Sequence, residues 1–274
     1  MTVVVGFPGP AGSHSGAAAA VLVPEAGRSV ALPSFISVVD AAVSAEVELG
    51  VLPIESTLAG PIAETHDLLY GAPLSIVREA SLHIRHCLLA MPGSSLEQIR
   101  VVRSHPAAFD QCRELFRSWP VQCVATSTTA DAARDVAERG DPSEAAIASH
   151  AAAEAYGLDV IAEDVSDRNA YTRFVAVAPH TRIDGGVAWR TALWFVTDHR
   201  PGSLFRALEP FARHGLNLVQ LVSRPLPDSP WRYRFDAVLD GHVFDQDVSA
   251  ALADLRAVTR RLRLFGSYPA EAPR

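Results

Sequence analysis

The stretch TVVVGFPGPAGSHSGAAAAVLV, residues 2–23, contains three kinds of sequence in order: an apolar β-branched run, a turn rich in Gly, Pro and Ser, and an alanine-rich run. β-Branched runs of this length favour strands, whereas alanine has the highest helix propensity. The stretch therefore predicts a strand, a tight turn and a helix, the repeating unit of α/β proteins. A helix that follows a strand presents unpaired N–H groups at its N-terminus, so the turn is also a candidate anion site.

The same alternation continues to about residue 178. Strands are predicted at GVLPIE (50–55), IRVVRS (99–104), AAIAS (145–149) and RFVAVA (173–178). Helices are predicted at AAAAVLV (17–23), VVDAAVSAEVE (38–48), AAFDQCRELFRSW (107–119) and TADAARDVAERG (129–140). We therefore expect residues 1–178 to form one α/β region with largely parallel strands.

A second domain follows a Pro- and Gly-containing break, which predicts a linker at residues 179–187. Residues 188–270 then give strand candidates at 188–198, 216–225, 231–241 and 261–268, and helix candidates at 202–215 and 245–259. Their order is β-α-β-β-α-β, the order of ferredoxin-like domains. Domains of this kind bind small ligands or self-associate through sheet edges.

Composition narrows the class of protein. The chain has 274 residues, 49% of them hydrophobic, which is enough for two domains with their own cores. The net charge of -7 argues against a nucleic-acid or acidic-membrane partner. No apolar stretch reaches the length of a membrane span, and the N-terminus lacks the basic region of a signal peptide. The three cysteines have no metal-ligand spacing, so we expect free thiols and a cytoplasmic protein.

All 24 basic residues are arginine, so the chain has no lysine. This excludes a lysine Schiff base and a P-loop lysine. An anionic ligand must instead be held by arginine, histidine, backbone N–H groups or hydroxyls.

Small hydroxyl residues occur at four turns, three after a predicted strand and one before a predicted helix. They include Ser13 and Ser15, Ser56 and Thr57, Ser104, and Thr126, Thr128 and Thr129. Each turn on its own is more simply explained as a helix cap. Four such turns in one region without lysine favour a cleft that binds carboxylates, but the pattern does not specify a reaction.

Five segments then show a specific resemblance. GPAGSHS, PIESTLAG, SHPAAFDQC, NAYTRF and GLNLVQLVSRP resemble, in order and spacing, prephenate dehydratase with its C-terminal ACT regulatory domain. The resemblance extends from Gly6 to Tyr268. It implies a two-lobed, periplasmic-binding-protein-like catalytic region with the active site in its cleft, and no metal or organic cofactor. It also implies prephenate as substrate, phenylpyruvate as product and a homodimer or homotetramer.

The resemblance assigns catalytic roles to Thr172, Gln111 and Ser56. The hydroxyl of Thr172 would hydrogen-bond the departing hydroxyl group in the transition state. Substrate-binding positions would be Ser13, Ser15, Glu55, Thr57, Ser104, Thr126, Thr128, Thr129, Arg173 and Phe174. For Arg173 an ion-pair role stays equally open, because strand alternation points it away from Thr172. Glu55 in the family holds the architecture, and we expect His105 to be structural.

Three departures from the family pattern bear on function. Ser56 replaces an active-site asparagine, and it is shorter and lacks the amide. His14 replaces an aromatic or similar residue, and it either titrates near neutrality or fills the same space. Val222 replaces the glutamate of the family's Glu-Ser-Arg-Pro segment. We therefore expect a weakened or altered response to L-phenylalanine at the implied effector site, formed by Gly202, Ser203, Leu204, Gly215, Asn217, Leu218, Ser223 and Arg224.

Several alternatives remain open. An arogenate dehydratase or a pathway-specific relative would tolerate the changes at Ser56 and His14. A non-catalytic sensor of aromatic metabolites would bind ligand in the cleft without turnover. A prephenate decarboxylase ranks third, because proteins of that kind lack the Thr-Arg-Phe motif and the ACT domain, and both features are present in this sequence.

Overall fold

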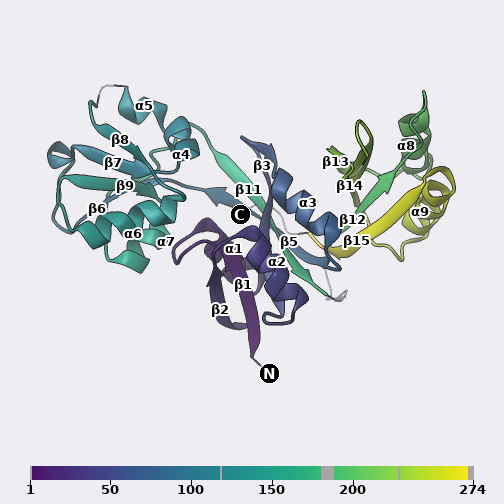
Figure 1. The fold of residues 1–274 in the computed structure, drawn as a ribbon, viewed down its shortest axis with the longest axis horizontal. Helices are drawn as coiled ribbons and strands as arrows, with labels where there is room; N and C mark the ends of the chain where they lie inside the picture. The colour runs from purple at the N-terminus through teal and green to yellow at the C-terminus, as the bar shows by residue number, and fades with distance from the viewer. Residues whose placement is uncertain (1, 118, 180–187, 228, 271–274) are drawn as a thin grey trace.

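The computed structural model describes residues 2–117, 119–179, 188–227 and 229–270. Three bodies lie side by side: a first α/β lobe in the middle, a second α/β lobe on one side of it and a C-terminal domain on the other (Figure 1). The predicted linker at 179–187 falls almost entirely outside the described residues. None of the described helices has the length and apolarity that a membrane crossing requires.

The first lobe is built on a mixed sheet in which β11 (Ala170–Ala178) and the short β4 (Gly60–Pro61) run antiparallel to their neighbours. Its strands, in spatial order, are β2 (Ala26–Leu32), β1 (Val3–Pro8), β3 (Leu49–Ser56), β11 and β5 (Ser75–Ile84), with β4 paired to β3. The lobe's helices are α1 (His14–Leu22), α2 (Phe35–Val43) and α3 (Ala63–Gly71). β1 pairs with β2 and β3 in parallel, whereas β11 is antiparallel to both β3 and β5. The prediction of largely parallel strands is therefore wrong for β11, because the chain leaves this lobe along β5 and returns from the second lobe along β11.

The second lobe has a sheet of mixed direction. Its strands, in order, are β10 (Asp159–Ala162), β6 (Cys87–Ala90), β9 (Glu144–Ala148), β7 (Val101–Ser104) and β8 (Gln122–Ala125). Its helices are α4 (Pro106–Gln111), α5 (Arg113–Phe116), α6 (Thr129–Arg139) and α7 (His150–Tyr156), with a 3₁₀ turn at Leu96–Gln98. β7 pairs with β8 and β9 in parallel, whereas β6 is antiparallel to β9 and β10.

Two helix predictions change in detail. The helix predicted at 107–119 is divided at Cys112, because the Asp167 carboxylate accepts the N–H groups of Arg113 and Glu114 at the start of α5. The helix predicted at 38–48 begins earlier, after the N-cap Ser34, and ends at Val43. The residues that follow lead directly into β3, so they are not available for another helical turn.

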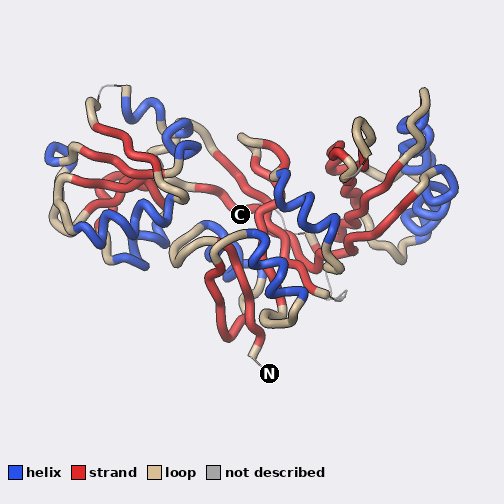
Figure 2. Tube along the Cα trace, viewed as in Figure 1, coloured by secondary structure: helices blue, strands red, loops and turns tan. Residues whose placement is uncertain are grey.

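The C-terminal domain confirms the predicted β-α-β-β-α-β order. Its elements are β12 (Trp189–Val196), α8 (Ser203–Arg213), β13 (Leu218–Pro225), β14 (Tyr233–Asp240), α9 (Gln246–Val258) and β15 (Arg261–Pro269). The strands form an antiparallel sheet in the order β13-β14-β12-β15. Both helices cover one face, away from the first lobe, and the other face points toward it (Figure 2).

The seam between the first lobe and the C-terminal domain is a shared apolar core. Trp194, Val238 and Phe265 from the domain pack in one cluster with residues of α2, α3 and β5. The backbones also approach closely, since a Cβ on Gly266 would stand 2.2 Å from the carbonyl oxygen of Ile76. The domain is thus packed against the lobe rather than tethered beside it.

Candidate active site

Thr172 and Ser56 lie opposite each other where β11 begins and β3 ends. They are register partners in the antiparallel ladder, so their side chains share a face. The Ser56 hydroxyl accepts hydrogen bonds from the N–H groups of Leu58 (3.3 Å) and Ala59 (3.5 Å) in its own turn. The Thr172 hydroxyl is only partly buried, and it makes no hydrogen bond to any other described group. The structure therefore brings together two of the three predicted catalytic residues and leaves one hydroxyl available to a ligand.

The opposite face of the same two strands carries charged residues. Arg173 lies opposite Glu55, with its Nη1 3.0 Å from Oε2, and its Nε is 3.5 Å from Oε1 of Glu79. These distances are those of ion pairs, although the N–H groups are not aligned for hydrogen bonds. Buried Glu79 also accepts from Arg190 and from the Tyr268 hydroxyl (3.1 Å), both in the C-terminal domain. Arg173 and Glu55 thus face the seam, and this arrangement supports the ion-pair role of Arg173 rather than substrate binding.

Phe174 does not contact the cleft. Its side chain is 2% exposed and packs in the core of the first lobe with residues of β1 and α1. The prediction that Phe174 binds substrate is therefore wrong, because an apolar side chain two residues beyond Thr172 is already deep inside the sheet's packed face.

Gln111 occupies the end of α4 in the second lobe. Its Oε1 lies 3.1 Å from Nε2 of His86, which is buried where the chain crosses from the first lobe to the second. The His14 ring from α1 stands edge-on to the His86 ring, with centroids 5.8 Å apart. Burial, together with the neighbouring His86, lowers the pKa of His14 to about 4, and burial also lowers the pKa of His86. Both imidazoles are neutral at pH 7, which favours the space-filling role for His14.

The hydroxyl-rich turns are used largely as helix caps. Ser13 accepts the Gly16 N–H at the start of α1, and Thr128 accepts the Asp131 N–H at the start of α6. The Thr126 hydroxyl donates to the Thr128 carbonyl within the same turn. Ser15 and Thr129 lie in the first turns of these two helices. The simpler explanation, a helix cap, therefore applies to Ser13 and Thr128, whereas Thr126 supports the turn that carries the cap.

Three more predicted residues, Ser104 and His105 before α4 and Thr57 after β3, have defined hydrogen-bond partners. Ser104 is fully buried and donates to the Ile147 carbonyl at 2.7 Å, so the prediction that it caps α4 and meets ligand is wrong. The cap is His105, whose Nδ1 accepts the Ala107 N–H at 3.1 Å, a structural role as expected. Thr57 joins the two strands, because its hydroxyl accepts the Tyr171 N–H at 3.0 Å.

The two lobes meet around an open hollow. The lobes also touch directly, since Ser149 at the start of α7 donates to the Gly12 carbonyl of the first lobe at 2.6 Å. The hollow measures about 410 Å³ and is lined by Leu58, Ala59, Ala107, Asp110, Gln111, Arg113, Asp167 and Arg168. This volume lies in the range of small-molecule sites. The turn that follows Ser56 and the helix that carries Gln111 form its two sides.

The predicted effector residues lie in two parts of the C-terminal domain. Gly202 and Gly215, at φ 78 and 67, flank α8, where Leu204 packs in the core and Ser203 accepts from Arg206. Asn217 donates to Asp240 at 2.8 Å, Leu218 begins β13, and Ser223 and Arg224 follow on that strand. The residues at α8 and those at β13 are thus separate parts of one βαβ unit.

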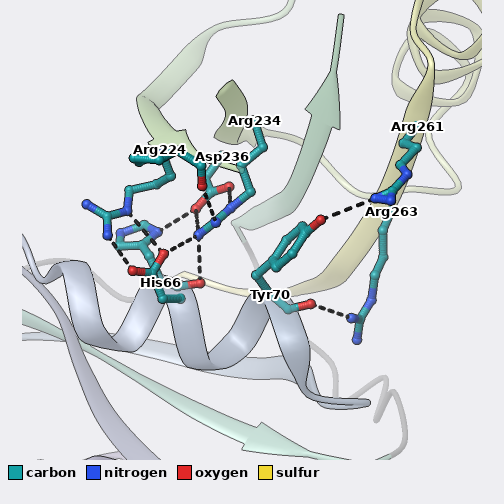
Figure 3. Close-up of polar contacts among 9 residues, drawn as sticks. His66, Tyr70, Arg224, Arg234, Asp236, Arg261 and Arg263 are labelled. Carbon is teal, nitrogen blue, oxygen red and sulfur yellow. Dashed lines mark hydrogen bonds and ion pairs between the residues drawn. The ribbon is translucent and has the colours of Figure 1, made fainter. Parts of the chain in front are cut away.

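Arg224 reaches the first lobe. It pairs with Asp67 of α3, whose carboxylate also accepts from Arg234 at 2.9 Å. Arg234 is fully buried and pairs with Asp236, which in turn contacts His66 at 2.9 Å (Figure 3). Burial alone would raise the pKa of Asp67, but hydrogen bonds from the two arginines hold it below its ordinary value. Arg224 therefore has an acidic partner on the first lobe, although Val222 replaces the acid expected on its own strand.

Sequence reasoning did not single out His86 and Glu79. His86 directly precedes the buried run Cys87–Ala90, just as Thr172 lies at the start of a buried strand. Glu79 is an acid in the middle of a mostly buried strand. A polar residue at the edge of an apolar run, or an acid within one, is a signal that could have identified both. Among the described residues, no group of three or more His, Cys, Asp or Glu side chains could hold a metal ion.

Two α/β lobes around a small-molecule cleft, followed by a β-α-β-β-α-β domain, define an enzyme-like ligand-binding protein with an attached small-ligand domain. The sequence model of the prephenate dehydratase family matches residues 5–182, and the chain belongs to this family. It is 35% identical over 280 residues to arogenate dehydratase/prephenate dehydratase 2, chloroplastic, of Arabidopsis thaliana, covering 98% of this chain and 73% of that protein.

Two solved structures are similar over almost the whole chain. One is a prephenate dehydratase from Arthrobacter aurescens in complex with L-Phe, with a TM-score of 0.87 and 30% identity, covering 97% of this chain and 90% of that one. The other is described as GqqA, a novel type of quorum quenching acylase, with a TM-score of 0.91 and 32% identity over 98% of both chains.

Proposed function

We propose that this protein is a prephenate dehydratase, a carbon–oxygen lyase that converts prephenate to phenylpyruvate in phenylalanine biosynthesis. The single observation that carries the proposal is the hydroxyl of Thr172, which lies opposite Ser56 in the β3–β11 ladder and makes no hydrogen bond to another described group. Family membership supplies the reaction, and the geometry supplies a group that can assist it.

The reaction makes modest demands on the protein. The bond to the ring carboxylate breaks and releases carbon dioxide, its electron pair enters the ring, and the ring hydroxyl leaves as hydroxide, which takes a proton to become water. Aromatisation drives these steps. The enzyme must hold two carboxylates and donate a hydrogen bond to the departing oxygen as negative charge develops there.

Each demand has a candidate group in the cleft. The Thr172 hydroxyl donates to the leaving oxygen, with Ser56 as its neighbour on β3. Gln111 and Arg168 line the hollow, and an amide and a guanidinium suit the substrate's carboxylates.

The first test follows phenylpyruvate formation from prephenate by its ultraviolet absorbance. We expect turnover with the wild-type protein and its loss in Thr172→Ala. Folding of both proteins is checked by circular dichroism. Absence of turnover and of prephenate binding in folded wild-type protein would overturn the proposal, whereas binding without turnover would indicate the non-catalytic sensor.

Arogenate is the alternative substrate. The Arabidopsis relative carries both activities in its name, and Ser56 is shorter than the family's asparagine. Restoring that amide in Ser56→Asn adds a hydrogen-bonding group, so we expect kcat/KM for prephenate to rise about two- to tenfold. The measurement compares prephenate and arogenate for wild type and variant. A fall for both substrates would show that the serine is adapted to this cleft.

The acylase described for one structural neighbour is a further candidate, carried by the high similarity of the two folds. An acylase needs an activated nucleophile, commonly Ser or Cys hydrogen-bonded to a base. Among the described residues, no Ser, Thr or Cys side chain is hydrogen-bonded to a histidine. The arrangement in this cleft is therefore better suited to the lyase reaction, and release of an acyl group from an acyl amide substrate would contradict that assignment.

We further propose that residues 188–270 are an ACT regulatory domain that responds to L-phenylalanine. The support is the strand and helix order together with the L-Phe complex of the Arthrobacter relative. Since Val222 lacks the family's charge and Arg224 is paired with Asp67, we expect a weakened or altered response. The test is prephenate turnover against phenylalanine concentration, with light scattering to distinguish dimer from tetramer. Sharp, cooperative inhibition at physiological concentrations would contradict the expectation.

A further inference from the structure

We propose that His86 is a positioning residue that orients the side-chain amide of Gln111, so that the amide NH₂ faces the cleft. The proposal rests on the proposed function, in which Gln111 contacts the substrate. His86 itself would not contact the substrate, because it is 3% exposed and its ring contacts Gln111.

The two partners are held on a fixed frame. His86 lies between β5 and β6, and its carbonyl accepts the Val165 N–H at 2.9 Å from the segment that returns to the first lobe. The Gln111 carbonyl accepts the Asp167 N–H at 2.7 Å from that same segment. Both backbones are thus tied to one connection between the lobes, and the 3.1 Å contact between their side chains follows from this arrangement.

The direction of the hydrogen bond decides what Gln111 presents to a ligand. A neutral imidazole carries one N–H donor and one bare acceptor nitrogen. With the proton on Nε2, His86 donates to Oε1 of Gln111, and the amide NH₂ is directed away from the ring toward the hollow. With the proton on Nδ1, Nε2 must instead accept from the amide, and Gln111 would present its carbonyl oxygen.

The substrate's chemistry selects between these two arrangements. A ligand with two carboxylates needs donors, and an amide oxygen directed at a carboxylate would repel it. The surroundings keep His86 uncharged, since it is buried beside the His14 ring, and among the described residues no carboxylate hydrogen-bonds to either ring. A single Nε2–H donor is therefore the arrangement that suits a substrate with two carboxylates.

Histidine-specific ¹⁵N NMR on the wild-type protein tests the tautomer directly. We expect the His86 signal of an imidazole protonated at Nε2, which changes in Gln111→Ala because the acceptor is removed. An Nδ1-protonated ring would overturn the proposal. This measurement does not depend on any His86 variant folding.

A double-mutant cycle tests the function of the contact. His86→Leu removes the donor at similar volume, and we expect kcat/KM for prephenate to fall about tenfold or more. His86→Gln places an amide N–H donor near the position of Nε2 and should recover most of that loss. In a Gln111→Ala background, His86→Leu should cause little further loss, because the residue it positions is gone.

A control variant and two contrary outcomes complete the test of His86. His199→Leu changes an exposed histidine of the C-terminal domain and should leave turnover unchanged. Multiplicative losses from the His86 and Gln111 variants would show that His86 acts independently, and the proposal would fail while the dehydratase function stood. If the wild type binds prephenate without turnover, the same cycle is run on the dissociation constant. If it neither binds nor turns over prephenate, the proposed function fails first.

Discussion

The two faces of the β3–β11 ladder carry very different side chains, although neighbouring residues of each strand alternate between them. On one face, Thr172 and Ser56 place hydroxyls side by side, and that of Thr172 has no described partner. On the other face, Arg173, Glu55 and Glu79 form a paired cluster against the C-terminal domain. Strand alternation separates the group available for chemistry from the groups that fix the strand.

The comparison explains how an unpaired hydroxyl stays in place. A donor assists a transition state best when its position is set in advance by surrounding structure. Charged groups behind it form ion pairs with one another and join β3, β5 and β11 to the seam. The polar face can therefore keep an unpaired hydroxyl until a ligand arrives, because the ion pairs on the charged face already hold the strands.

The largest effect should come from removing the Thr172 hydroxyl while keeping the shape of the side chain. In Thr172→Val we expect kcat to fall roughly 10²–10³-fold, the range for losing one preorganised donor. The free energy of unfolding should change by less than about 1 kcal/mol, since the hydroxyl makes no hydrogen bond to another described group. Steady-state assays and urea titrations measure the two quantities. Thr172→Ser keeps the donor and should retain most of the activity; near-normal turnover in the valine variant would contradict the assignment.

The next effect concerns the charged face. In Glu79→Gln, Arg173 and Arg190 lose a shared buried carboxylate, and we expect unfolding to become easier by about 3 kcal/mol. Urea denaturation measures this change. Glu97→Gln, at a fully exposed acid, is the control. A destabilisation no larger than that of the control would mean that the cluster contributes nothing to holding the strands.

The same contrast shows what the sequence can predict. Thr172 and Arg173 could be assigned to opposite faces from alternation alone, and the β-α-β-β-α-β order follows from local apolar periodicity. By contrast, β2 gives little signal because most of its residues are exposed, and α7 lies within an alanine-rich run. The antiparallel direction of β11 depends on where the chain returns from the second lobe, and pattern carries no such information.

Site residues divide in the same way. The motif positions Thr172, Ser56 and Gln111 are recognisable in sequence, but the partner of each is not. His86 meets Gln111 and Arg224 meets Asp67 only because segments distant in the chain pack together. Ser104 and Phe174 were assigned to the ligand because sequence could not show how deeply each is buried.

The contact between the two α/β lobes at Gly12 gives the third largest expected effect on activity and stability. A methyl group on Gly12 would stand 2.5 Å from the Cα of Ala152 in the other lobe, and the backbone there has φ +75. We expect Gly12→Ala to separate the lobes, lowering kcat/KM about tenfold and stability by about 1–2 kcal/mol. Gly93→Ala is a matched control, because its φ is +80 but nothing lies within 4 Å. Equal effects in both variants would mean that backbone strain, not lobe contact, is responsible.

The smallest effect lies at the seam and depends on pH. Hydrogen bonds from Arg224 and Arg234 hold the pKa of Asp67 below its ordinary value of 3.8 in the folded protein. The folded state therefore binds this proton less readily than the unfolded state. Its contribution is present above pH 3.8 and is lost as the pH falls through the lower, folded value.

Because Asp67 is half exposed, solvent screening keeps this contribution below about 1 kcal/mol. Urea titrations of wild type and Asp67→Asn between pH 7 and pH 3 should show a small difference at neutral pH that shrinks toward the acid end. Arg224→Gln should produce the same convergence, because it removes one of the two donors that lower the pKa. A gap that stays constant with pH would show that the aspartate acts through its shape and hydrogen bonds rather than its charge. Asp67 would then stabilise the seam without using its charge, unlike the ion-paired Glu79 cluster beside it.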